Sequence, residues 1–193
     1  MSNDSSGNPN ISEGPNVSAW PPVGEVALRK RVIAVHDLAG FMRAAQHHDA
    51  LAVWAYLDEY YALCAEQVAG AGGRVVKFVG DACLAIFPPD RCVEAVDAMA
   101  QLREQVSGLS RRRGFPVGSG ATNVHLATIA EGDLGPEGLR RFDVIGEGVN
   151  HTFLLGSRMG PGVHVSEPVY RQLPNDRRGP WKKQRPPATY TLC

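Results

Sequence analysis

The 193-residue sequence lacks the features that mark membrane-spanning, secreted and general nucleic-acid-binding proteins. No apolar run approaches the roughly 20 residues that cross a bilayer. The N-terminus has no basic segment followed by an apolar one, so we do not expect secretion. Twenty basic residues balance twenty acidic ones, and a neutral chain is a poor general binder of nucleic acid. We therefore expect neither a membrane nor a nucleic acid as a partner.

Cysteine is also scarce. Its four copies, Cys64, Cys83, Cys92 and Cys193, show no Cys-x-x-Cys spacing. This argues against a metal cluster and against a disulfide framework. A reducing compartment, the cytoplasm, is the expected location of such a chain.

The chain is long enough for one compact domain with a sizeable core. Residues 1–24 are rich in Ser, Asn, Gly and Pro and have almost no apolar periodicity, which is typical of a disordered leader. Residues 25–193 hold the patterned segments and are expected to form the domain. The sequence contains no internal repeat.

Beyond the leader, strand and helix patterns predict an α+β domain with a ferredoxin-like, mainly antiparallel sheet and helices on one face. Strands are expected at 31–36, 74–79, 82–87, within 117–134, and at 142–145, 163–165 and 189–192, and helices at 40–69, 91–106 and 147–159. Only Gly80-Asp81 separates the second strand from the third, which indicates a hairpin.

Two aspartates stand where a sheet would hold them rigidly. Asp37 ends the first expected strand, and Asp81 lies in the tip of the hairpin. Two carboxylates aimed at one place suit Mg²⁺ or Mn²⁺, which also takes oxygens from substrate phosphates. Gly40-Phe41, just after Asp37, could present backbone N–H groups to a phosphate at a helix start. An aspartate in a turn also has an ordinary structural explanation, because its side chain bonds to nearby backbone.

Four segments carry a family resemblance. Residues 35–41, 72–87, 142–150 and 162–166 read VHDLAGF, GGRVVKFVGDACLAIF, FDVIGEGVN and GVHVS. In content and order they resemble the motifs of the class III adenylyl and guanylyl cyclases, and the resemblance covers roughly residues 30–192. It implies the class III cyclase fold.

The resemblance also implies a role for each acid. Asp37 and Asp81 would bind two divalent cations, Mg²⁺ or Mn²⁺, with the Leu38 carbonyl as a further ligand. One cation would activate the ribose 3′-hydroxyl and the other would neutralise the triphosphate. This is the two-metal arrangement for an in-line displacement in which pyrophosphate leaves.

Lys77 and Asp143 stand where the family reads the purine, and Asn150 stands where it orients the ribose. A lysine donates to adenine N1 and an aspartate accepts from the adenine amine, whereas guanine needs an acceptor at the position of Lys77. The pair therefore predicts ATP rather than GTP, because the wrong base would leave buried polar groups unpaired.

The sequence departs from the family pattern near the triphosphate. Four residues after the asparagine the family usually has an arginine, where this chain has Leu154, which cannot donate to phosphate. Arg158, one helical turn further, could reach back, and an ordinary surface arginine is the competing interpretation. A second cation is expected from the C-terminal arm, where Lys182 or Lys183 could supply it or could simply stand in a solvated turn.

The expected activity is conversion of ATP into 3′,5′-cyclic AMP and pyrophosphate. In the family, one protomer supplies the metal residues and the other reads the base, so a chain that carries both sets predicts a symmetric homodimer with composite active sites. Two alternatives stay open. Leu154 favours a weak or inactive cyclase-like module that binds ATP, and substitutions near Asn150, which could reshape the pocket, favour a cyclase for another nucleoside triphosphate. The basic run Arg111–Arg113 has no motif context and is interpreted as solvated surface.

Overall fold

The computed structural model describes residues 20, 24–156, 159–184 and 188–192. The strands are β1 (Ala27–Ala39), β2 (Arg74–Val79), β3 (Ala82–Phe87), β4 (Gly118–Leu134), β5 (Arg141–Ile145), β6 (Gly162–Ser166), β7 (Lys182–Gln184) and β8 (Thr189–Leu192). The helices are α1 (Phe41–Ala45), α2 (Ala50–Gly70), α3 (Cys92–Arg113), α4 (Glu147–Leu155) and α5 (Glu167–Gln172), with short 3-10 turns at Pro89–Arg91 and Asn175–Arg177. Within these residues, no helix combines the length and the apolar character needed to cross a membrane. Most of the expected leader, residues 1–24, lies outside the described residues.

The described strands form one sheet in the order β2-β3-β1-β4-β6-β8-β7, and β5 pairs with the far end of β4. Among these strands, β4 and β6 are parallel and the other neighbours are antiparallel. The predicted α+β class with a mainly antiparallel sheet is therefore confirmed.

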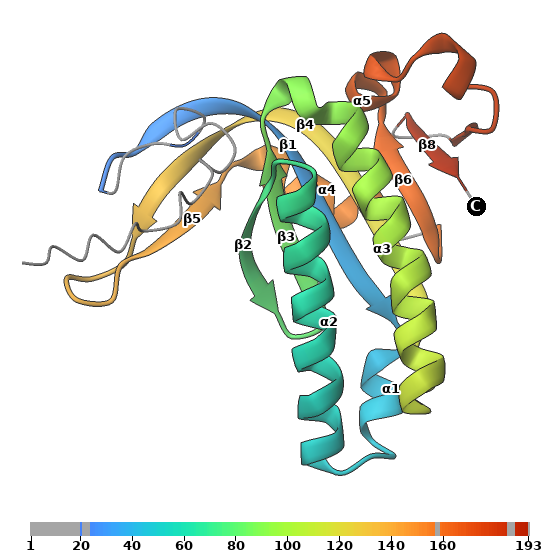
Figure 1. The fold of residues 1–193 in the computed structure, drawn as a ribbon. Coiled ribbons are helices and arrows are strands. Elements are labelled where there is room, and N and C mark those ends of the chain that lie inside the picture. Colours follow the sequence, from blue (N-terminus) through green and yellow to red (C-terminus); the bar gives the residue numbers. More distant parts are fainter. Residues whose placement is uncertain (1–19, 21–23, 157–158, 185–187, 193) are drawn as a thin grey trace, which may run out of the picture.

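The long helices α2 and α3 lie side by side over one face of the sheet (Figure 1). Helix α2 buries a residue at every fourth position, Tyr56, Tyr60, Cys64 and Val68. This spacing keeps the four side chains on one stripe of the helix. The stripe joins the larger apolar core between the helices and the sheet.

Helix α4 lies on the opposite face. There Val149 packs into a second, smaller core with Ile33 and Val35 of β1, whereas Val32 and Ala34 belong to the core under α2 and α3. Alternate residues of a strand point to opposite faces, so β1 is covered on both sides. The prediction of helices on one face is correct for α2 and α3 and wrong for α4, because the apolar pattern of this nine-residue helix does not specify which face it covers.

Two local signals define elements near the expected site. The predicted helix 40–69 is in fact two helices, because the Asp49 side chain caps α2 by accepting two backbone N–H groups of its first turn. The predicted hairpin is present, with Gly80 and Asp81 as its two-residue turn. Gly80 has φ of 60°, the positive value that such turns need at their first central residue.

The sheet curls so strongly that β2 and β5 come into contact although β3, β1 and β4 separate them. The guanidinium of Arg74 on β2 lies over the Phe142 ring of β5, 3.6 Å from its centroid. Figure 1 shows β1, β4 and β5 continuing as a bent arm beyond the helices. Strand-to-strand twist accumulates across a sheet, and here it brings two distant strands together on the α4 face.

The arm contains a buried ion pair. Arg31 donates to the Glu131 carboxylate at 2.5 and 2.7 Å, and both residues are at most 3% exposed. The Trp20 ring lies over the Arg31 guanidinium, and the backbone N–H of Gly24 donates to Asp133. Residues that precede β1 therefore pack on the arm.

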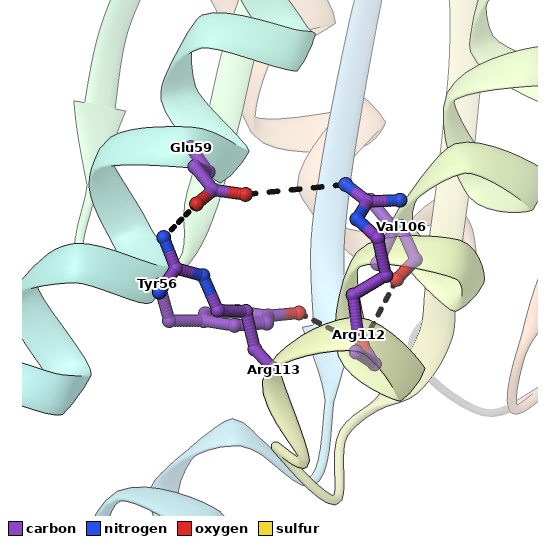
Figure 2. A network of polar contacts seen from close by, with 6 residues as sticks. Tyr56, Glu59, Val106, Arg112 and Arg113 are labelled. Carbon is purple, nitrogen blue, oxygen red and sulfur yellow. Dashed lines mark hydrogen bonds and ion pairs between the residues drawn. The ribbon is translucent and has the colours of Figure 1, made fainter.

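Polar contacts join α2 to α3, as Figure 2 shows. Glu59 of α2 pairs with Arg113 and, at 3.9 Å, with Arg112. Close by, the Tyr56 and Ser110 hydroxyls lie 3.0 Å apart in the core. The interpretation of the basic run as solvated surface is thus incomplete, because two of its arginines link the helices.

Candidate active site

The two aspartates expected to bind metal lie at the same end of the sheet. Asp37 is near the end of β1, opposite Ala82 of β3, and Asp81 comes directly before Ala82 in the hairpin turn. Asp37 is two residues from Val35 and so shares the α4 face of the strand. Antiparallel pairing of β1 with β3 therefore brings the two acids together.

The electrostatics of this pair fit a divalent cation. Burial raises the pKa of both carboxyl groups, and the charge of Asp37 raises that of Asp81 further. A cation between them would relieve both effects. Within the described ranges, no group of three or more His, Cys, Asp or Glu side chains could hold a metal ion. The pair would complete the cation's shell with carbonyl, water and substrate oxygens, which is the usual environment of Mg²⁺.

Backbone irregularities follow Asp37 directly. The register between β1 and β4 shifts between Asp37 and Ala39, so Leu38 of β1 lies opposite two residues of β4, Ser119 and Gly120. The Leu38 side chain is buried in the core. Gly40 has φ of 80° and begins the five-residue α1, and the Phe41 ring is buried against Phe115. The Leu38 and Phe41 side chains are therefore not available to a substrate, and these two residues could contact one only through their backbone.

The two residues expected to read the purine are in direct contact. Lys77 on β2 donates to Asp143 on β5 over 2.8 Å. The other Asp143 oxygen accepts the backbone N–H of Val144, also at 2.8 Å, which fixes the carboxylate. The Lys77 and Asp143 side chains are 43% and 21% exposed, so a ligand can reach them.

Helix α4 carries the residue expected to orient the ribose. Asn150 is exposed near the start of this helix, and Leu154 is exposed one turn later, as its spacing requires. The arginine considered as a substitute, Arg158, lies outside the described residues.

Lys182 and Lys183 are exposed on β7, at the opposite edge of the sheet from β2. The Lys183 ammonium lies 5.7 Å from the centroid of the Tyr190 ring. The structure does not bring either lysine to Asp81 within one chain.

A pocket of about 420 Å³ opens beside Asp37, between β1, β4 and the end of α4. Its lining residues are Val35, Asp37, Ala39, Ala121, Asn123, Phe153, Gly156, Gly160 and Pro161. Asn123 is 5% exposed, and its amide oxygen has no hydrogen-bond partner among the described residues. Glycine is needed at position 156, because a Cβ there would stand 2.3 Å from that oxygen.

Sequence reasoning did not identify two residues that contact the neighbours of the carboxylates. Tyr60 contacts His36, the residue before Asp37, and Tyr61 contacts Gly80, the residue before Asp81. The Tyr-Tyr pair in the sequence was visible, but both residues also fit an apolar helix pattern. The sequence did not mark Asn123 as a pocket residue, because the residues around it have the pattern of any half-buried strand.

Two solved structures with the same architecture are cyclases. The adenylyl cyclase CyaB from P. aeruginosa matches with a TM-score of 0.77 over 88% of this chain and 96% of that chain, at 19% identity. The guanylyl cyclase Cya2 matches with a TM-score of 0.71 over 89% of this chain and 94% of that chain, at 21% identity. The fold is that of a nucleotidyl cyclase catalytic domain. At these identities the likeness establishes the fold alone.

Curated relatives of this cyclase-like domain are adenylate cyclases. The adenylate cyclase of Anabaena cylindrica is 24% identical over 161 residues, which is 78% of this chain and 32% of that protein. The photoactivated adenylate cyclase subunit alpha of Euglena gracilis is 25% identical over 152 residues, 74% of this chain and 15% of that protein. The chain thus spans about a third or less of these relatives. No family model matches it.

Proposed function

We propose that this chain is a class III adenylyl cyclase domain that converts ATP into 3′,5′-cyclic AMP and pyrophosphate. The observation that carries the proposal is the contact between Lys77 and Asp143, which sets a cationic donor beside an anionic acceptor. Adenine presents N1 as an acceptor and its amine as a donor, so it can replace this mutual contact group for group. Guanine presents a donor at N1 and would oppose Lys77.

The carboxylate pair supplies the second half of the proposed site. Asp37 and Asp81 would hold two Mg²⁺ or Mn²⁺ ions, with the Leu38 carbonyl as a further ligand. The bound ions would supply charge for the triphosphate and lower the pKa of the ribose 3′-hydroxyl. The two side chains would hold the ions at the end of the sheet where β1 and the hairpin turn meet.

The remaining roles belong to residues around the phosphates and the ribose. Asn150 would orient the ribose, and backbone N–H groups at Gly40 and Phe41 would bind phosphate oxygens. Lys182 or Lys183 would stabilise charge on the triphosphate, and Arg158 could add to it. We assign the activity to the cytoplasm, which agrees with the described cysteines being free thiols.

We further propose that the site is shared between two copies of the chain. The lysines of β7 lie at the opposite edge of the sheet from the hairpin, so they could serve Asp81 only across a dimer. Apolar side chains exposed on α4, Phe153 at 38% and Leu154 at 67%, would be covered by a partner.

Subunit mixing tests the shared site. Asp37→Ala and Lys77→Ala should each be inactive alone. In an equal mixture that exchanges subunits, half of the dimers carry one variant of each kind with one intact site of two, so about a quarter of wild-type activity should return. A mixture of Asp37→Ala with Asp81→Ala is the matched control and should stay inactive, because both variants damage the same half of the site. Continued inactivity of the first mixture, with exchange verified, would contradict a shared site.

Leu154 and the guanylyl cyclases among the similar structures favour testing a second candidate. The chain could bind a nucleotide with little turnover, or it could cyclise another nucleotide. Purified protein with Mn²⁺ should be assayed against all four nucleoside triphosphates, with binding of each measured in parallel. Cyclic AMP production that Asp81→Asn abolishes supports the cyclase, whereas ATP binding without product supports the binding module.

A further inference from the structure

Two consecutive tyrosines of α2 each contact the residue that precedes one of the two aspartates. The Tyr60 hydroxyl lies 2.9 Å from His36 Nδ1, and His36 precedes Asp37. The Tyr61 hydroxyl donates to the Gly80 carbonyl at 2.6 Å, and Gly80 precedes Asp81. One turn of α2 thus contacts both segments that present the carboxylates, β1 and the hairpin turn.

The Tyr60 hydroxyl contacts both the ring and the backbone of His36. It lies 2.9 Å from Nδ1 of the ring and donates to the His36 carbonyl at 3.3 Å. The other ring nitrogen, Nε2, lies 3.0 Å from the Ser119 carbonyl, which can only accept, so Nε2 donates to it. Tyr60 and His36 are both fully buried, so this contact is rigid.

Tyr61 of α2 contacts the hairpin at β2 and at its turn. Its ring stacks on Phe78 of β2, with centroids 3.8 Å apart, and its hydroxyl reaches the turn itself. Strand β2 is the edge of the sheet, so only β3 supports it by backbone pairing. The stack and the hydrogen bond together fix the hairpin tip against α2.

We propose that Tyr60 and Tyr61 are positioning residues that fix the separation of the Asp37 and Asp81 carboxylates and so set the affinity of the site for a divalent cation. This inference rests on the metal-binding role proposed above. The carboxylates of Asp37 on β1 and Asp81 in the hairpin turn repel each other when both are ionised, and a hairpin tip without these contacts would relax away from β1. The tyrosines oppose that relaxation before a cation arrives, so the cation does not have to draw the hairpin tip toward β1.

Mn²⁺ binding to the full chain, followed by the electron paramagnetic resonance signal of free Mn²⁺, tests this without any need for turnover. Tyr61→Phe keeps the ring stack and removes only the hydroxyl. It should raise the Mn²⁺ dissociation constant by about threefold to tenfold, the range expected for one hydrogen bond. Tyr60→Phe should raise it at least as much, because both the ring and the carbonyl of His36 then lose their contact with the hydroxyl.

Tyr56→Phe is the matched control. This substitution also replaces a tyrosine of α2 by phenylalanine and removes a buried hydrogen bond. The Tyr56 hydroxyl, however, bonds to Ser110 of α3. Tyr56→Phe should leave the Mn²⁺ dissociation constant unchanged even where it lowers the melting temperature. In assays of turnover, Tyr61→Phe should need more Mn²⁺ for half-maximal activity and regain the wild-type rate at saturating Mn²⁺.

The outcomes separate the two proposals. Two results would overturn the positioning role and leave the metal site intact. In the first, all three tyrosine substitutions change the Mn²⁺ dissociation constant equally. In the second, Tyr60→Phe and Tyr61→Phe leave it unchanged while Asp81→Asn abolishes Mn²⁺ binding. If wild type and Asp81→Asn bind Mn²⁺ alike, the metal site itself is wrong, and the positioning role fails with it.

Discussion

The Lys77 ammonium lies 2.8 Å from the Asp143 carboxylate although 66 positions separate the two residues in the chain. They stand on β2 and β5, which only the curl of the sheet brings together. A half-exposed ion pair of this kind contributes at most about 1 kcal/mol to stability. This accessible pair therefore contributes little to the stability of the fold and is better placed to bind a ligand.

Substitution of Lys77 should change base preference more than stability. Lys77→Met should lower kcat/KM for ATP by about a hundredfold, because adenine N1 loses its donor within a partly buried site. Lys77→Glu should in addition shift the ratio of ATP to GTP turnover toward GTP. Initial rates with each nucleotide measure this, and Lys30→Met, at an exposed position of β1, is the control. An unchanged nucleotide ratio in Lys77→Glu would show that this residue does not read the base.

Restoring an arginine at position 154 should raise turnover. Leu154 is exposed one helical turn after Asn150, so Leu154→Arg would present a guanidinium where charge develops on the triphosphate. Loss of one such donor typically costs about a hundredfold or more in kcat, and its return should recover a large part of that. The kcat for cyclic AMP formation is the measurement, and Leu154→Met controls for the loss of leucine alone. No gain would mean that another cation already serves this position.

Removing one carboxylate should stabilise the metal-free protein. Burial and the Asp37 charge raise the pKa of Asp81, so the folded state holds its proton more tightly than the unfolded chain does. Ionisation of Asp81 therefore opposes folding, and the free energy of unfolding falls as pH rises through the pKa range of this group. In buffer containing EDTA near pH 7, Asp81→Asn should melt at a higher temperature than wild type. Mn²⁺ should raise the melting temperature of wild type only, and a lower melting temperature for the variant would contradict the argument.

Acid should destabilise the fold through histidines that are partly or fully buried. Burial, with a contribution from His151, lowers the pKa of His125 to about 4. The unfolded chain protonates this histidine near its ordinary value of 6.5, so between about pH 6.5 and 4 the unfolded state binds more protons. The free energy of unfolding should therefore fall as pH decreases through this window, and His36 adds to the same effect.

Urea unfolding at pH 7, 6 and 5 measures this dependence. His125→Gln should make it shallower, whereas His47→Gln, at an exposed position of the chain, tests for effects of the substitution type alone. A pH dependence that is identical in wild type and His125→Gln would show that the unfolded-state proton on this residue has no influence on stability.

Much of the fold and part of the site could be predicted because their determinants are local. A glycine with positive φ between two β-rich runs specifies the hairpin that carries Asp81, and the order of strands and helices specifies an α+β domain. The cap at Asp49 divides the first helix, and it was missed because the apolar pattern continues across the break. The face covered by α4 could not be predicted, since a short helix with apolar residues on several sides packs wherever the sheet offers a partner.

The sequence by itself determined which residues we propose to carry the chemistry: one carboxylate near a strand end, one in a hairpin turn, and a lysine and an aspartate in segments that resemble family motifs. Neighbours only a few positions away set each of these local conformations. Only the tertiary structure decided that Lys77 meets Asp143, that Tyr60 and Tyr61 contact the residues before the two aspartates, and that Lys182 lies at the far edge of the sheet. These relationships depend on strand register and on twist accumulated over several strands, which no short stretch of sequence contains.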